Sequence, residues 1–552
     1  MATKKSSAKK SSAKKTSTKK MSSTKKTSKK ASTAGEIKAQ AGKSAKGKEF
    51  DPALESMAAL AATVVELNEP RPSTSRYPIP DEKFRTLKEA AAKKVIAKGD
   101  ATIAKDKGNK VELAGGAMAA FAPAGGPVSA APMGATNFAG ITSTGWLPPD
   151  CTMAAGPSHI VLSVNSSIAV FNKSGGAPLL QRTLTVWFSN VIQNATIFDP
   201  KLLFDQHTGR WVLLAVAVSQ NPQRAAYLLS VSATGNPLGS WRNYSLNAMV
   251  DGTTATTNWA DFPALGVDAN NLYITSNQFA FNGGFQYAKI RIVPKAGPYS
   301  GGPAPFFDFV RMRNPNGTTA FTIQPCHTFG APQVEYLVNS LFPNGNSLTI
   351  WRLTQSGSTF SLTRTSVPTS NYSLGPNAAQ RGNNDPLNTG DVRVLHAVFR
   401  SDSIWCALTT AHNWTGTTNT ASIHWFQIRA AAPALVQQGV FGSANVHSFY
   451  PACCPDANGN MIMVFSRSGT NEFGSIFFTG RKATDPLGSL QPSALLKAGI
   501  ANYVLKDNGG RNRWGDYNGI CADPSNPKGI WFYSEFASAV NTWATFVGSA
   551  FF

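Results

Sequence analysis

Apolar and polar positions follow a block that recurs along the C-terminal three-quarters of the chain. Each copy has an acidic or aromatic residue, a short apolar run, a turn rich in Asp, Asn and Gly, and a second apolar run. The clear copies begin at Asp150, Asp199, Asp261, Asp391, Tyr450 and Asp516, and a weaker one without the acid lies near Ala331. Two apolar runs around such a turn predict a pair of β-strands.

The spacing of these blocks predicts the architecture. Copies recur roughly every 50–70 residues, and a strand-containing unit with such a period is typical of propeller blades. From about residue 141 to 552 the chain is rich in predicted strands and turns. We therefore predict an all-β fold, a β-propeller of about seven blades, or six because the fourth copy is degraded. The alternating terminal segment TWATFVGSAFF is expected to complete the first blade and remove an open sheet edge.

The N-terminal 50 residues have a different composition from the rest of the chain. They contain 16 Lys and 2 Glu, so they contribute +14 to the net charge of +22, and the body is only mildly cationic. Ser, Thr and Ala make up most of the remainder. A segment with so few apolar residues cannot bury a core, so residues 1–50 are predicted to be a disordered basic tail.

This tail resembles the tails of linker histones and bacterial histone-like proteins. The resemblance implies binding to a polyanion through counterion release, without sequence readout. The paired lysines expected to make these contacts are Lys4, Lys5, Lys9, Lys10, Lys14, Lys15, Lys19, Lys20, Lys25, Lys26, Lys29 and Lys30. A solubilising or surface-adhering arm is the alternative. The charge pattern does not distinguish nucleic acid from anionic lipid or acidic polysaccharide.

Residues 51–112 are predicted to be a short helical segment. Asp51 and Pro52 suit the N-cap and first position of one helix, and DEKFRTLKEAAAKKVIAKG predicts a second helix with a narrow apolar stripe. That stripe could dock on the propeller, self-associate or bind another protein. Residues 113–140 are predicted to be an Ala/Gly/Pro linker, which leaves 141–552 for the propeller.

Cysteine usage and targeting signals leave the compartment open. The six cysteines show no metal-type spacing, and we expect them to be reduced. The N-terminus lacks the apolar core of a secretory signal, and no apolar stretch is long enough to span a bilayer. The composition of the body nevertheless looks extracellular, so localisation is not assigned.

Several stretches of the body point to a known family. These are GWLPPDCTMAAGPSHIVLSVNSSIAVFNKSG, DPKLLFDQHTGRWVLLAV, ADFPALGVDANNLYITSNQF, TGRKATDPLGSL and RWGDYNGICADP. Residues 145–552 resemble bacterial, mostly secreted, sialidase-like β-propeller proteins of poorly defined function. GNPLGSW (235–241) and TDPLGSL (484–490) resemble the Asp-box (BNR repeat) turn of such propellers, with the glycine displaced by one position. Residues 1–112 lie outside the resemblance.

The repeated acids are the first candidate site. If each acid opens an innermost strand, then Asp150, Asp199, Asp261, Asp391 and Asp516 lie around one channel mouth. Converging carboxylates need a bound cation, raised pKa values or dedicated hydrogen-bond donors. No cofactor is expected, although a structural cation such as calcium would suit such a ring. A structural role, in which each Asp accepts backbone N–H bonds from the next blade, is favoured because catalysis needs only one or two acids.

The resemblance also suggests catalytic parts without assigning them. Sialidases bind the substrate carboxylate with three arginines and use a Tyr–Glu nucleophile and an Asp acid. Candidate counterparts are Arg210, Arg393, Arg511, Arg513, Tyr517 and Glu535, with Asp516 as the acid. None lies in a motif that aligns residue by residue with those enzymes. The cluster Arg513-Trp-Gly-Asp516-Tyr517 is either a carbohydrate or anion site or a closure motif between blades, and we favour closure.

Together these patterns favour a non-enzymatic recognition or scaffold protein. The propeller loops would bind a glycan or a protein, and the tail would bind a polyanion such as nucleic acid. One alternative is a sialidase-like glycoside hydrolase. Another is a structural component of a larger particle, in which the tail contacts packaged nucleic acid. No oligomeric state is predicted.

Overall fold

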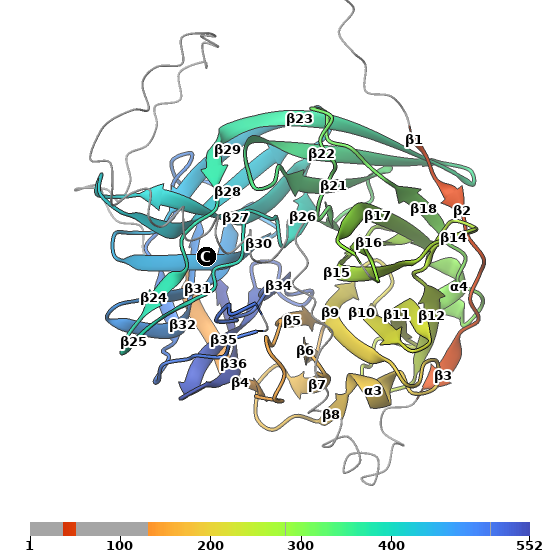
Figure 1. Cartoon of the computed structure of the whole chain (residues 1–552), viewed down its shortest axis with the longest axis horizontal. Helices are drawn as coiled ribbons and strands as arrows, with labels where there is room; N and C mark the ends of the chain where they lie inside the picture. Colours follow the sequence, from red (N-terminus) through yellow and green to blue (C-terminus); the bar gives the residue numbers. More distant parts are fainter. Residues whose placement is uncertain (1–36, 51–130, 282, 508) are drawn as a thin grey trace, which may run out of the picture. The chain divides into compact units, whose positions relative to one another are not determined.

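The computed structural model describes residues 37–50 and 131–552, apart from residues 282 and 508. The paired lysines of the tail, the helical segment and most of the linker lie outside these ranges. Within them the chain is almost entirely β-structure, arranged as blades around a common axis (Figure 1). No helix of the described part is long and apolar enough to cross a membrane. The predicted all-β propeller is therefore confirmed for these residues.

Five sheets stand as separate blades, each with four antiparallel strands from the propeller body, and residues 37–50 add a fifth strand to two of them. The first blade contains β5 (Thr152–Ala155), β6 (His159–Val164), β7 (Ser167–Asn172) and β8 (Leu180–Thr183). The second contains β9 (Thr196–Asp205), β10 (Arg210–Gln220), β11 (Gln223–Ser232) and β12 (Trp241–Asn247). The third contains β19 (Gln324–Pro325), β21 (Val334–Ser340), β22 (Asn344–Ser356) and β23 (Thr359–Ser373). The fourth contains β30 (Val446–Pro455), β31 (Met461–Gly469), β32 (Glu472–Arg481) and β33 (Ala494–Lys497). The last contains β34 (Gly519–Ala522), β35 (Ile530–Ala539), β36 (Thr542–Phe551) and β4 (Met133–Thr142).

Two further meanders are fused into one ten-stranded sheet. They contain β15 (Asn258–Val267), β16 (Asn271–Ala280), β17 (Phe285–Pro294) and β18 (Phe307–Val310), and β26 (Ala397–Arg400), β27 (Ser403–Asn413), β28 (Asn419–Arg429) and β29 (Ala434–Phe441). The short strand β20 (His327–Thr328) runs parallel to both β15 and β26 and joins them. The described chain thus has five separate blades, which corrects the expected count of seven or six.

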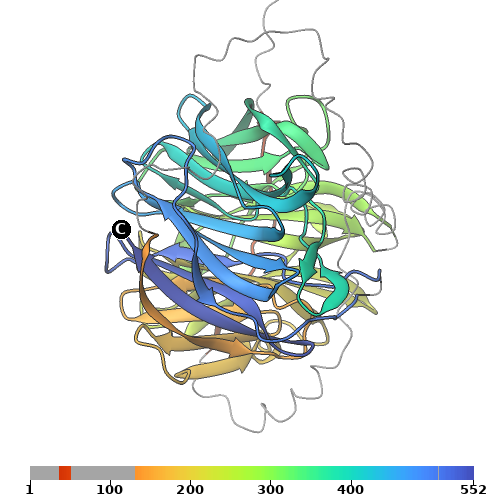
Figure 2. The same ribbon diagram turned by 90° about the vertical axis from the view of Figure 1, so that its left-hand side faces the viewer.

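Minor elements connect these sheets. They are the hairpins β13 (Val250–Asp251) with β14 (Thr254–Ala255) and β24 (Ala378–Gln380) with β25 (Asn383–Leu387), and the helices α3 (Leu184–Trp187) and α4 (Ala296–Ser300). The innermost strands β5, β9, β15, β19, β26, β30 and β34 surround the axis, with β20 between β15 and β26. Figure 2 shows the same blades from the side.

The ends of the propeller close differently from the expectation. The terminal strand β36 is the third strand of the last blade, and β4 pairs with it as the fourth. The propeller therefore begins at Met133 and not at residue 141, and residues 133–140 are not a linker. Pairing with the N-terminal strand β4 covers the edge of β36. The sequence had indicated that this open sheet edge must be removed.

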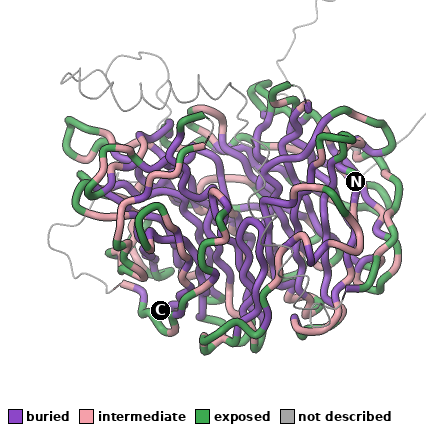
Figure 3. The backbone as a smooth tube through the Cα atoms, turned by 60° about the horizontal axis from the view of Figure 1, so that its bottom comes forward, coloured by how far each residue is buried: buried purple, intermediate pink, exposed green. Residues whose placement is uncertain are grey.

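Burial on both faces explains the short apolar runs. In β10 successive residues point to opposite faces of the blade. Val212, Leu214 and Val216 pack in one interblade core, whereas Trp211 and Leu213 pack in the core on the other side. A strand whose two faces both pack against neighbouring blades is apolar at nearly every position. Its sequence is therefore a continuous apolar run and not an alternation of apolar and polar residues. Figure 3 shows the buried strands inside and exposed residues in the peripheral loops.

A left-handed backbone residue lies within each inner strand or a few residues before it. These residues are Asp150, Asp199, Phe262, Thr322 and Tyr450, with φ between 50° and 53°, and Gly390 and Gly515, with φ of 64° and 27°. The pairing register shifts opposite Asp199, Phe262 and Tyr450, as expected for β-bulges. The aligned acids are therefore not equivalent, because Asp261 precedes this position and Asp391 and Asp516 follow it.

Residues 37–50 form an ordered strap along the rim, here called the rim strap. β3 (Lys48–Phe50) pairs with β12, β2 (Gln40–Ala41) with β18, and β1 (Ile37–Lys38) with β23, all antiparallel. The strap thus adds one strand to the outer edges of three sheets (Figure 1, red). This part of the predicted disordered tail is corrected.

The rim strap is held by backbone pairing, close contacts and one aromatic anchor. Gly42 donates its N–H to the Phe306 carbonyl at 2.7 Å, and a Cβ on Gly42 would lie only 1.8 Å from the Phe306 ring. Phe50 is 4% exposed and packs on Trp187, with ring centroids 5.1 Å apart. Composition did not reveal the strap because backbone pairing at a sheet edge requires few apolar side chains.

Candidate functional site

Two of the repeated acids link neighbouring blades. Asp199 on β9 accepts the backbone N–H of Phe262 on β15 at 3.2 Å. The Asp199 N–H donates to Asn165 Oδ1 at 2.7 Å, and Asn165 Nδ2 donates to Asp150 at 2.6 Å. All four residues are buried. The two carboxylates therefore belong to a hydrogen-bond chain that crosses three consecutive meanders.

The other repeated acids have different surroundings. Asp391 accepts from Arg393 N and Nε, both at 2.9 Å, and the Arg393 guanidinium lies 4.1 Å from the Phe262 ring centroid. Asp261 lies within β15 and is 5% exposed. Among the described residues, no group of three or more His, Cys, Asp or Glu is arranged to hold a metal ion. A structural calcium ion stays a prediction.

Three of the candidate catalytic residues, Arg513, Asp516 and Glu535, lie close together where the last blade meets the first. Arg513 donates to Asp516 at 2.8 Å. Glu535 on β35 is 1% exposed, and a Cβ on Gly515 would lie 2.3 Å from Glu535 Oε1. Burial, together with the charges of Asp150 and Asp516, raises the pKa of Glu535 well above its usual value. The environment of Glu535 therefore favours its neutral form.

The fourth candidate, Tyr517, faces the axis. Its hydroxyl donates to the Pro200 carbonyl at 2.9 Å. Its ring lies beneath the amine of Lys201, whose Nζ is 2.9 Å from the ring centroid. Tyr517 is thus in contact with its neighbours Pro200 and Lys201 on β9.

The arginines do not form a three-arginine clamp. Arg210 donates to the carbonyls of Ser232 and Ala233. Arg511 pairs with Asp507 at 2.7 Å, and Arg393 pairs with Asp391 at 2.9 Å. Each of these three guanidinium groups is therefore engaged by its own protein partner.

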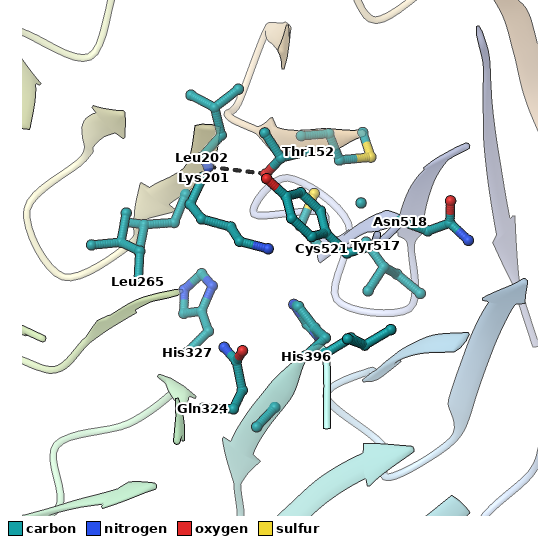
Figure 4. A pocket seen from close by; sticks show the side chains of 16 residues that line it. Thr152, Lys201, Leu202, Leu265, Gln324, His327, His396, Tyr517, Asn518 and Cys521 are labelled. Atoms are coloured by element: carbon teal, nitrogen blue, oxygen red, sulfur yellow. Dashed lines mark hydrogen bonds between the residues drawn. The ribbon is translucent and has the colours of Figure 1, made fainter. Parts of the chain in front are cut away.

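A small cavity, here called the axial cavity, lies between the inner strands. Its volume is about 40 Å³. It is lined by Thr152, Lys201, Gln324, His327, His396 and Tyr517, together with apolar neighbours (Figure 4). Since one enclosed water needs about 10–15 Å³ on this measure, the space holds about three waters and is much too small for a sugar ring.

Burial favours the uncharged forms of the amine and the two imidazoles that line the axial cavity. Burial lowers the pKa of Lys201 to about 7, against the opposing effect of the nearby carboxylates of Asp199, Asp150 and Asp516. Burial also lowers the pKa of His327 to about 3 and that of His396 to about 4. Both imidazoles are therefore neutral at ordinary pH.

Sequence reasoning missed Lys201. The residue lies in the run DPKLLF, which was interpreted only as a strand start. A lysine surrounded by apolar residues on an innermost strand was the available signal, because such a strand has no solvent-facing side for a charged amine.

A second, open cavity lies at the periphery of the ten-stranded sheet and is here called the arginine cleft. Its volume is about 620 Å³. The lining residues are Ala255, Thr256, Thr257, Asn258, Gln286, Tyr287, Arg311, Arg313 and Thr319. Hydroxyl, amide and guanidinium groups thus dominate its surface. The sequence signal was the pair of arginines before the turn NPNG, which was not singled out.

A network beneath the arginine cleft positions Arg311. The Arg311 side chain is 64% exposed, pairs with Asp251 at 3.3 Å and lies 4.6 Å from the centroid of the Tyr287 ring. Tyr287 donates to Asp251 at 2.7 Å, and Asn258 donates to Tyr287 at 3.2 Å. Lys289 also pairs with Asp251, at 2.9 Å. The buried network around Asp251 and Tyr287 therefore orients the Arg311 guanidinium, while the outer face of this group stays open to solvent.

Comparisons with known proteins do not assign a family. No protein-family model and no curated protein matches the chain. A solved α-L-arabinofuranosidase from Fusarium graminearum is 8% identical, with 75% of this chain and 97% of that chain covered and a TM-score of 0.36. The Trypanosoma rangeli sialidase is 9% identical, with 73% and 58% covered and a TM-score of 0.33.

A WD40 domain of SCAP from fission yeast is matched in the same way. It is 10% identical, with 72% of this chain and 84% of that chain covered and a TM-score of 0.30. Matches this distant carry no argument about activity. The fold assignment rests on the strand topology described above.

Proposed function

We propose that this protein is a non-enzymatic β-propeller recognition protein that binds an acidic glycan in the arginine cleft. The observation that carries the proposal is the pre-positioned, exposed guanidinium of Arg311 in a cleft of about 620 Å³. Ligand sites for small molecules commonly have volumes of about 300–1,000 Å³. The axial cavity, at about 40 Å³, offers no comparable space.

The chemistry of the lining favours a glycan that carries a carboxylate or sulfate. Guanidinium groups bind such anions through paired hydrogen bonds. Thr256, Thr257, Gln286 and Thr319 supply hydroxyl and amide groups that can exchange hydrogen bonds with sugar hydroxyls. A protein partner would instead require an apolar centre to the interface, and the cleft lining is mostly polar.

One observation favours the competing glycoside hydrolase function. Glycosidases need one protonated and one ionised carboxyl, and burial together with the nearby Asp150 and Asp516 raises the pKa of Glu535 well above its usual value. However, Glu535 is 1% exposed and does not line the axial cavity. A substrate would have to open the last blade to reach it, which is why the binding function is preferred.

Glycan binding by matched arginine variants tests the proposal. The wild-type chain, Arg311→Ala and Arg429→Ala would be compared on arrays of sialylated, uronate-containing and neutral oligosaccharides, followed by calorimetric titration. Arg429 is exposed on β28 and donates to the Ala432 carbonyl, so it is a matched control outside the cleft. We expect acidic glycans to bind the wild type and Arg429→Ala, and Arg311→Ala to bind about tenfold more weakly.

Other results of these assays would contradict the proposal. Equal binding of neutral and acidic glycans, or equal loss in both variants, would contradict the proposed cleft. Turnover of a fluorogenic sialoside that is abolished by Asp516→Asn in a folded protein would establish the hydrolase function instead.

We further propose that the lysine pairs of residues 1–30 bind a polyanion, which follows from charge alone because this segment lies outside the described residues. Deleting residues 1–36 leaves the rim strap in place and should abolish salt-sensitive binding of DNA. Unchanged DNA binding would remove this part of the proposal. Association of native material with a particle would support a structural role in a larger assembly.

A further inference from the structure

Within residues 37–50 and 131–552, Lys201 differs from the other buried lysines, Lys289 and Lys295, in having no ion-pair partner. Its residue exposure is 9%, compared with 4% for Lys295 and 0% for Lys289, and all three lysines are buried. Lys289 pairs with Asp251 at 2.9 Å and Lys295 pairs with Asp205 at 2.7 Å. In contrast, Lys201 Nζ forms no hydrogen bond or salt bridge with another described residue, and its contacts are the faces of Tyr517 and Phe262. A buried amine without a partner calls for a chemical explanation.

The amine projects into the axial cavity. Figure 4 shows the Lys201 side chain directed towards the space between Tyr517, His327 and His396. Because its pKa is about 7, comparable amounts of ammonium and free amine are present at neutral pH. Lysines that act as nucleophiles are commonly desolvated in this way.

The groups around Lys201 Nζ determine whether a product formed on this amine is favoured as a cation or as an anion. His327 and His396 are neutral, and each has one ring nitrogen close to a protein acceptor: Gln206 Oε1 at 2.7 Å and the Cys453 carbonyl at 3.2 Å. If these nitrogens carry the protons, the other ring nitrogens are lone-pair acceptors. Asp199, Asp150 and Asp516 act on Lys201 as negative charges, and Arg393 is the opposing cation. A cationic adduct is therefore favoured over an anionic one such as a carbamate.

We propose that Lys201 is a covalent site at which a one- or two-carbon aldehyde condenses with Nζ inside the axial cavity. The cavity volume of about 40 Å³ sets the size limit. Apolar walls from Met153, Leu265 and Leu395 limit water, which otherwise hydrolyses an imine. This site is separate from the arginine cleft and does not depend on the glycan-binding proposal.

The reaction balances without a cofactor. The free amine attacks the carbonyl carbon and forms the C–N bond, while the carbonyl oxygen gains a proton and the nitrogen loses one. Loss of the hydroxyl as water then forms the C=N bond. Starting from the ammonium form, one aldehyde gives one iminium and one water, with no change in total charge and no oxidation.

Site-resolved reductive trapping tests this inference. The full chain would be incubated at pH 7 with limiting acetaldehyde and cyanoborohydride, and early modification of each lysine would be measured by peptide mass spectrometry. We expect Lys201 to be modified at least about tenfold faster than exposed Lys528, because an ordinary lysine is almost wholly protonated at this pH. Lys289 is the buried, ion-paired control and should remain unmodified.

Two further arms keep the test decisive. Benzaldehyde is too large for the axial cavity and should not modify Lys201 in the folded chain, and denaturation should abolish the preference for Lys201. Lys201→Met, checked for folding by thermal melting, should lose the fast-reacting site and retain the slow ones. Modification of Lys201 no faster than Lys528, or equal reaction with benzaldehyde, would overturn the proposal.

Discussion

The axial cavity and the arginine cleft use the same pair of groups, a cation over a tyrosine ring, with opposite consequences. Lys201 is 9% exposed, with its amine 2.9 Å from the Tyr517 centroid. The Arg311 side chain is 64% exposed and lies 4.6 Å from the Tyr287 centroid, with Asp251 beside it. Burial without an ion pair favours the neutral amine, whereas the guanidinium of Arg311 faces solvent and is oriented by Asp251 and Tyr287. Covalent chemistry therefore suits the first site and anion binding the second.

The largest expected effect is on the pH dependence of stability at Lys201. The folded pKa of about 7 is below the unfolded value near 10.5, so between these values the unfolded chain binds the extra proton. The free energy of unfolding of the wild type therefore rises with pH there, by about 1.4 kcal/mol per pH unit from this group. Lys201→Met removes that slope, and it should be more stable than the wild type at pH 7, with the difference shrinking towards pH 10.

Urea denaturation at pH 7, 8 and 9 measures this difference. Lys289→Met is the control, since it leaves Asp251 with one cation fewer and should destabilise the fold at every pH. Parallel pH profiles for the wild type and Lys201→Met would show that Lys201 is not desolvated, and the contrast between the two sites would fail.

The next effect concerns the architecture around the axis. Asp199→Ala removes the acceptor of the Phe262 N–H and places alanine at φ 51°. An unsatisfied buried donor and a left-handed non-glycine residue together should cost about 2–4 kcal/mol of unfolding free energy. Asp199→Asn keeps an acceptor oxygen and tolerates the left-handed region, so it should retain at least half of that stability. Equal losses in the two variants would assign the effect to charge instead.

The smallest stability effect is expected in the arginine cleft. Arg311→Ala should change the free energy of unfolding by no more than about 0.5 kcal/mol, because the side chain is mostly exposed and Lys289 still pairs with Asp251. Thermal melting of Arg311→Ala beside Asp199→Ala checks this ranking. A large loss in Arg311→Ala would make the arginine a structural residue and weaken its assignment to ligand binding.

Local pattern was sufficient for the propeller and insufficient for the rim strap. The runs around Asp199 and Tyr450 predict hairpins because neighbouring strands are also neighbours in sequence. The rim strap pairs with strands hundreds of residues away and uses mainly backbone groups, so its Lys-rich composition resembled disorder. Phe50 provides the one aromatic anchor of residues 37–50, and the small side chains of Ala39 and Ala45 pack only partly against the cores.

The aligned acids show why the candidate site was only partly predictable. Their positions in the sequence repeat, but the feature that recurs in the structure is a left-handed residue, which is Asp150 or Asp199 in two meanders and Gly390 or Gly515 in others. The sequence identified Arg513, Asp516 and Glu535 as candidate residues, and the fold brings these three residues together. It did not reveal that the carboxylates of Asp150 and Asp199 would hydrogen-bond to Asn165 and Phe262.

By itself, the sequence determined the all-β class and the repeating blade, because strand pairing within each meander is local and leaves a regular apolar pattern. Tertiary structure decided the fusion of two meanders through β20, the closure of the last blade by β4 and the course of the rim strap. It also decided the environments of Lys201 and Arg311. Desolvation and charge support depend on which distant strands surround a side chain, and one-dimensional patterns do not contain that information.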